Sequence, residues 1–82
     1  MKALTPEEAK VVGGLKRLAG AKRVVTGREL RDCGFADFVA QVYRVDVAYP
    51  QSLRSRKLQI LRDKGYIRME RRDGGTYTLL EA

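Results

Sequence analysis

A long helical pattern followed directly by two alternating segments is the feature that most constrains the fold of this chain. From residue 51 to 64, apolar residues recur at helical spacing, and Gly65 suits the position just past a helix end. Residues 67–71 and 76–80 then alternate apolar and polar side chains, as strands do. The Asp73-Gly74-Gly75 run between them favours a tight turn. The sequence therefore predicts a helix followed by a two-stranded β-hairpin.

Two capping boxes predict further helices upstream. Thr5 with Glu8, and Thr26 with Glu29, have the spacing in which a hydroxyl and a carboxylate each accept a hydrogen bond from the other residue's backbone N–H. We expect one helix to run from the first box to Gly20, with Gly13-Gly14 marking close packing or a bend. Further segments are a short β stretch at Val24-Val25, a helix from Thr26 to about Gly34, a helix at about 36–44, and the helix at 51–64, which we expect Ser52 to cap.

This order predicts one α+β domain over residues 1–82, without repeats or linkers. Three to four helices followed by a C-terminal two-stranded β-hairpin is the layout of a winged helix-turn-helix. In that fold the last helix enters the DNA major groove, and the hairpin, or wing, contacts the flanking backbone or the minor groove. We expect the buried core to include Leu58, Leu61, Ile67, Met69, Tyr77 and Leu79, together with Tyr43 and a buried Cys33.

The charge of the chain is concentrated on the predicted last helix and hairpin. The chain has 17 Lys and Arg against 10 Asp and Glu, a net charge of +7. Residues 51–72 hold eight of the basic residues and only Asp63 and Glu70, which leaves +6 on this segment. A basic patch of this kind favours an anionic partner, and nucleic acid is the commonest large one.

Composition argues against catalysis and metal binding. There is no His and a single Cys, which excludes zinc sites with several Cys or His ligands and any Ser-His-Asp or Cys-His site. Glu8-Ala9-Lys10 has nuclease-like spacing but no upstream Asp to complete a magnesium site. We expect no enzyme activity and no cofactor. Apolar runs are short and the one cysteine cannot form an internal disulfide, so we expect no membrane contact and a cytoplasmic or nucleoid-associated location.

Three groups of residues are candidates for DNA contact. On the last helix, Arg and Gln suit guanine and adenine edges, whereas the alternative is a solvated basic face. On the hairpin, arginines suit phosphates, whereas the alternative is edge-strand charge that opposes aggregation. Basic residues flanking the Thr26 helix suit the backbone, and Tyr49 could stack on bases. The candidates are Arg54, Ser55, Arg56, Lys57, Gln59, Arg62 and Ser52 on the helix, Arg68, Arg71 and Arg72 on the hairpin, and Lys22, Arg23 and Arg28 upstream.

The run Leu58-Gln59-Ile60-Leu61-Arg62-Asp63-Lys64-Gly65, followed by Gly75-Thr76-Tyr77-Thr78-Leu79, resembles the C-terminal winged-helix domain of type II restriction endonucleases. These include the methyl-directed group that cuts adenine-methylated DNA. The resemblance covers about 30 residues and implies a DNA-binding domain without the family's nuclease domain. The family usually has Ile-Arg-Gln where this chain has Arg54-Ser55-Arg56. The resemblance therefore carries over no sequence or methylation preference.

Other readings stay open at this point. The chain is either a standalone DNA binder or one domain of a longer protein. The main alternative function is a protein–protein module that forms a homodimer or docks on an acidic partner, with the first-helix face around Val11, Leu15 and Leu18 as the interface. Binding to RNA is a further alternative, for which no motif argues.

Overall fold

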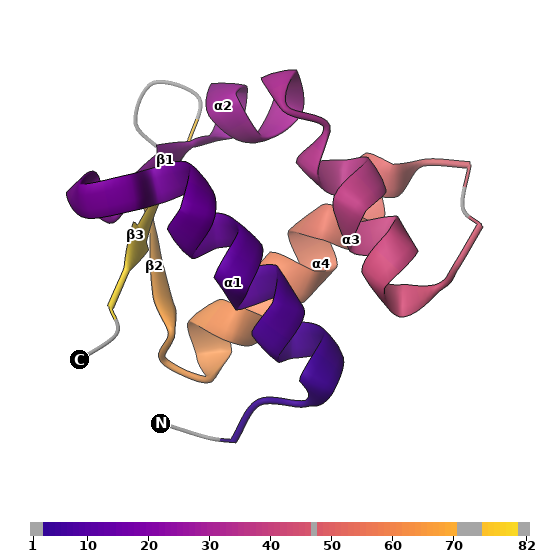
Figure 1. Cartoon of the computed structure of the whole chain (residues 1–82), viewed down its shortest axis with the longest axis horizontal. Coiled ribbons are helices and arrows are strands. Elements are labelled where there is room, and N and C mark those ends of the chain that lie inside the picture. The colour runs from indigo at the N-terminus through magenta and orange to yellow at the C-terminus, as the bar shows by residue number, and fades with distance from the viewer. Residues whose placement is uncertain (1–2, 47, 71–74, 81–82) are drawn as a thin grey trace.

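The computed structural model describes residues 3–46, 48–70 and 75–80, and within them the chain forms a small α+β domain (Figure 1). The helix α1 crosses in front of α4 in this view, and the strands gather at one side of the molecule. The elements are α1 (Pro6–Ala19), the 3₁₀ turn η1 (Gly20–Lys22), β1 (Val24–Thr26), α2 (Gly27–Asp32), α3 (Phe35–Tyr43), α4 (Pro50–Asp63), β2 (Ile67–Glu70) and β3 (Thr76–Leu79).

Both predicted capping boxes are present. In the first, the Thr5 N–H donates to Glu8 Oε1 at 2.9 Å and the Glu8 N–H donates to Thr5 Oγ1 at 3.2 Å. In the second, Thr26 and Glu29 exchange the same two bonds at 3.1 Å each. These bonds satisfy backbone donors that a helix start otherwise leaves unpaired. The local sequence therefore determines where α1 and α2 begin.

The start of α4 differs from the prediction that Ser52 caps it. The helix begins earlier, at Pro50, and Tyr49 occupies the cap position without a side-chain hydrogen bond. Proline suits the first helical position because its missing N–H needs no partner there. Ser52 is therefore the third helical residue, and its N–H donates to the Tyr49 carbonyl at 3.0 Å.

The end of α4 follows the prediction at Gly65. This glycine has φ +90°, a left-handed conformation that glycine adopts without the strain a side chain would cause. The Gly65 N–H donates to the Arg62 carbonyl and the Tyr66 N–H donates to the Leu61 carbonyl, both at 3.0 Å. This pair of bonds is a Schellman motif, which turns the chain directly into β2.

The sheet has three strands: the predicted hairpin is joined by the short β stretch predicted at Val24-Val25, which the sequence did not assign to the same sheet. The strand β3 lies in the middle, antiparallel to both neighbours, with the order β1-β3-β2. Ile67 pairs with Leu79 in the hairpin, and Val25 pairs with Tyr77 across β1 and β3. Sequence spacing could not show that β1 joins the hairpin, because its partner β3 is distant in sequence. Asp73 and Gly74 of the predicted turn lie outside the described residues.

Residues from the helices and from the sheet form one hydrophobic core. Its largest fully buried side chains are those of Leu15, Leu30, Leu58, Leu61 and Ile67. Leu79 is also buried, as predicted, while Met69, Tyr77 and Tyr43 are partly buried and pack against the core. The burial of helix, strand and hairpin residues in one cluster holds the α4–hairpin unit against the rest of the chain.

Two predictions about buried and exposed residues were wrong. Val11 and Leu15 are 1% and 0% exposed, so the predicted interface on α1 is core and only the half-buried Leu18 reaches the surface. Cys33 is exposed rather than buried. It caps the end of α2, and its thiol donates to the Leu30 carbonyl at 3.4 Å. In both cases helical position alone did not show which side the neighbouring elements cover.

A buried carboxylate, that of Glu8, links the start of α1 to the end of α4. Glu8 is 7% exposed, and besides its capping bond it accepts a hydrogen bond and ion pair from Lys64 Nζ at 2.5 Å. Lys64 Nζ also donates to the Ala3 carbonyl at 3.2 Å. Burial alone raises the pKa of Glu8, but the bonds from Lys64 and Thr5 and the Lys64 charge outweigh it, and the net pKa is lowered.

We expect the adjacent glycines of α1 to respond oppositely to alanine. A Cβ at Gly13 meets nothing within 4 Å, whereas one at Gly14 lies 2.8 Å from a ring carbon of Phe38. Gly13→Ala should raise the free energy of unfolding by about 0.5–1 kcal/mol through helix propensity. Gly14→Ala should lower it, because the ring must move. Urea unfolding measures both, and equal gains would contradict close packing at Gly14.

We expect Glu8→Gln to lower the free energy of unfolding at pH 7 by about 1–3 kcal/mol, because it removes a buried charge-assisted bond. The folded pKa of Glu8 lies below its ordinary value of 4.5, so its contribution is present above that value and is lost as pH falls through the folded pKa. Unfolding measured from pH 7 to 3 should show a shallower pH dependence in the variant. An unchanged dependence would disprove the coupling.

Candidate nucleic-acid interface

The helix α4 turns one face inward and one outward. Leu53, Leu58 and Leu61 are buried. Ser52, Arg56 and Gln59 lie on the opposite side and are exposed, with Arg62 exposed and Ser55 half-buried beside them. At 3.6 residues per turn, residues 52, 56 and 59 follow one another along a single stripe. The structure thus brings these predicted contact residues together on one accessible surface, here called the outer α4 face.

Two other predicted contact residues lie on the inner flank of α4. The Lys57 ammonium lies 4.2 Å from the centre of the Tyr43 ring, a cation–π contact between α4 and α3. The Nε of Arg54 is buried and has no hydrogen-bond partner among the described residues. Burial, followed by the negative charges of Glu8 and Glu7, raises the pKa of Tyr43, so its phenol stays neutral. Lys57 therefore contributes to helix packing as well as to charge.

Local acids partner much of the positive charge. Arg62 bonds to Asp63 at 3.2 Å, and on β2 the Arg68 guanidinium lies 3.2 Å from Glu70. Lys64 is occupied by Glu8. In the described part of α4, Arg56 is the exposed cation for which no acidic partner lies within ion-pair distance. The net charge of +6 already counts Asp63 and Glu70, so only Glu8 lowers it further; what the pairs decide is which cations have an acidic neighbour.

Main-chain hydrogen bonds hold the upstream basic residues beside the sheet. The Gly27 N–H donates to the Gly75 carbonyl at 2.9 Å, which places the exposed Arg28 next to the base of the β2–β3 connection. Lys22 and Arg23 are exposed at the other end of β1. The Arg23 carbonyl accepts from the Leu79 N–H at 2.8 Å. Arg71 and Arg72 lie outside the described residues.

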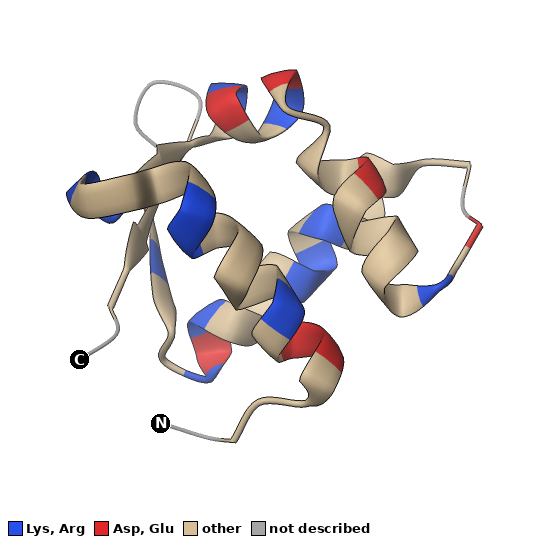
Figure 2. Ribbon diagram, viewed as in Figure 1, with Lys and Arg blue, Asp and Glu red and all other residues tan. Residues whose placement is uncertain are grey.

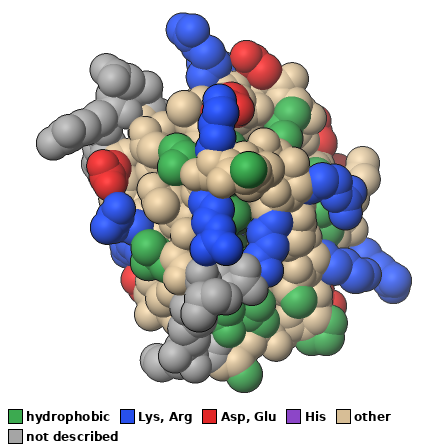
Figure 3. All heavy atoms as spheres, turned by 60° about the vertical axis from the view of Figure 1, so that its left-hand side comes forward, with side chains coloured by type: hydrophobic (Ala, Val, Ile, Leu, Met, Phe, Trp, Pro, Cys, Tyr) green, Lys and Arg blue, Asp and Glu red, His purple; other side chains and the backbone are tan. Residues whose placement is uncertain are grey.

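Basic residues are not restricted to α4 and the hairpin. Figure 2 shows them on α1 and α2 as well, and it shows acidic residues on α1, α2, α3 and the end of α4. On the face turned forward in Figure 3, basic side chains stand at separate places with hydrophobic and uncharged surface between them. Charge alone therefore does not single out α4, and its outer face is defined by the exposed Arg56, Gln59 and Ser52 on one helix.

Tyr49 is a further candidate that the structure strengthens. It occupies the cap position of α4 and is 75% exposed. An exposed aromatic ring at the start of a helix is able to stack on a base or a sugar. The sequence identified the Tyr49 ring as a candidate but could not show that it is exposed. Tyr43, six residues earlier, is the same residue type and packs against the core.

Among the described residues, no group of three or more Cys, Asp or Glu side chains is arranged to hold a metal ion. No helix in this part of the chain has the length and apolar character needed to cross a membrane. No protein-family model, curated protein or solved structure matches the sequence or the fold. The resemblance to restriction endonuclease winged-helix domains therefore stays a prediction.

We expect Arg54→Met to raise the free energy of unfolding by up to about 1 kcal/mol, because it removes a buried donor without a partner and keeps the apolar stem. Arg56→Met is the matched control on the exposed side and should change stability by less than about 0.5 kcal/mol. Chemical denaturation compares them. A larger loss for Arg54→Met than for Arg56→Met would show that the Arg54 guanidinium stabilises the fold.

Proposed function

We propose that this chain binds double-stranded DNA, with α4 in the major groove and the β2–β3 hairpin on the flanking backbone. The observation that supports it is the outer α4 face, where Ser52, Arg56 and Gln59 are exposed together while the three buried leucines anchor the opposite side. A helix held in this way presents side chains to a groove without having to be ordered on binding.

The chemistry of the outer α4 face suits base edges. Arginine donates two parallel hydrogen bonds to guanine O6 and N7, and glutamine pairs with adenine N6 and N7. Arg56 and Gln59 are three residues apart, so on one helix face they address neighbouring base pairs. Ser52, in the first turn of α4, suits a phosphate, because the helix start concentrates N–H donors and partial positive charge.

The remaining candidates have positioning roles in this proposal. Arg68 on β2 and Arg28 beside the hairpin base supply phosphate contacts, which add affinity without sequence preference. Lys57 holds α4 against α3 through Tyr43. The proposed role is that of a targeting or regulatory module without catalysis of its own.

We expect Arg56→Ala to weaken duplex DNA binding about tenfold or more, because one bidentate contact to a base is lost. The DNA would be chosen by selection from a random duplex pool, with and without adenine methylation. Fluorescence anisotropy would then give the Kd at several salt concentrations. Wild-type affinity should fall steeply with salt, because phosphate contacts release counterions.

Lys10→Ala is the charge-matched control for this measurement. Lys10 is exposed on α1, outside the outer α4 face, and the Lys10→Ala substitution removes the same single charge. The proposal expects Lys10→Ala to have a clearly smaller effect than Arg56→Ala. Equal losses would show that only net charge matters. A preference for duplex RNA, or affinity that does not depend on salt, would overturn the proposal.

A further inference from the structure

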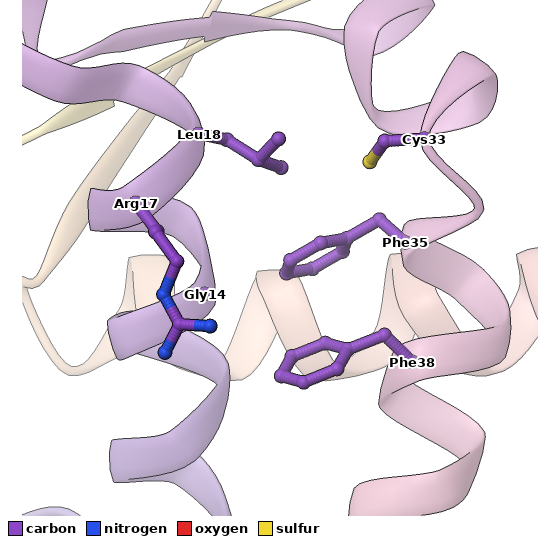
Figure 4. A pocket seen from close by; sticks show the side chains of 6 residues that line it. All are labelled: Gly14, Arg17, Leu18, Cys33, Phe35 and Phe38. Carbon is purple, nitrogen blue, oxygen red and sulfur yellow. The ribbon is translucent and has the colours of Figure 1, made fainter.

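A pocket opens between α1 and the segment that joins α2 to α3, apart from the outer α4 face. It has a volume of about 270 Å³ and is lined by Gly14, Arg17, Leu18, Cys33, Phe35 and Phe38. Phe35 and Phe38 project from α3 toward α1, and Leu18 and Cys33 face each other across one end of the pocket (Figure 4). The two rings lie 5.3 Å apart between centroids and are tilted by 44°.

The lining of this pocket is apolar apart from one cation. Gly14 lets both phenylalanine rings pack directly on α1, because a Cβ there would come within 3.2 Å of each ring and closer still to Phe38. Arg17 lies on the α1 side of the pocket, is exposed, and makes no ion pair with any described residue. Two aromatic rings favour an aromatic guest, and the planar guanidinium fork of arginine matches a carboxylate.

We propose that this pocket binds a small aromatic carboxylate of one or two rings, with the ring against Phe35, Phe38 and Leu18 and the carboxylate on Arg17. The volume lies near the lower limit for ligand pockets, which restricts the guest to this size. The opposite charge of guest and Arg17 distinguishes this guest from a neutral hydrocarbon or an amine. The proposal does not depend on DNA binding, since it concerns the free chain.

The single cysteine of the chain provides a direct readout. Cys33 lines the pocket and is exposed, so a thiol reagent reports on this place alone. We expect 1-naphthoate to slow the reaction of Cys33 with a thiol reagent in a saturable manner. In two-dimensional NMR, the same titration should shift the amide signals of Gly14, Leu18 and Phe35. The neutral 1-naphthamide should bind about tenfold more weakly, because the charge-assisted bond to Arg17 is lost.

Arg17→Gln should remove the preference for the acid over the amide, while both still bind the rings. Lys10 is an exposed cation on the same helix outside the pocket lining, so Lys10→Gln should leave the preference unchanged. The proposal is overturned if acid and amide protect Cys33 equally in the wild type. It is also overturned if Lys10→Gln weakens naphthoate binding as much as Arg17→Gln, or if neither compound gives saturable protection.

Discussion

The burial of one leucine stripe on α4 is the constraint on which the rest of this structure depends. Leu53, Leu58 and Leu61 face the core, and burying each side chain contributes about 1.5–3 kcal/mol. Together they fix the rotation of the helix about its axis. That rotation in turn selects Ser52, Arg56 and Gln59 as the residues that reach solvent, and sets Arg54 and Lys57 against neighbouring elements.

The charge of the last helix and hairpin acquires a different meaning once this rotation is known. The sum over residues 51–72 is +6, which already counts Asp63 and Glu70. These two acids lie beside Arg62 and Arg68, and Glu8, from outside the segment, lies beside Lys64. The Arg62–Asp63 and Arg68–Glu70 pairs lie at the surface, so they contribute little to stability, and water and salt compete with them. On the described α4 they leave Arg56 as the exposed cation without an acidic partner, beside the glutamine that suits a base edge.

Local hydrogen bonding made a large part of the fold predictable. Capping boxes at Thr5 and Thr26, and a glycine just past α4, act within a few residues of one another, so sequence spacing reveals them. Sequence spacing did not show the strand pairing and the side-chain exposure that depend on distant residues. The strand β1 pairs with β3 from the other end of the chain, and Cys33 is exposed because α1 and α3 leave a pocket there rather than covering it.

The amino-acid sequence by itself determined the α+β class, the order of the elements and the concentration of basic residues near the C-terminal end, because these follow from periodicity, capping and composition. The tertiary structure alone decided which of those residues are accessible. It brought Glu8 to Lys64 and Lys57 to Tyr43, and it left an aromatic pocket beside Arg17. These contacts join residues from different elements, and only packing in three dimensions sets the distance between them.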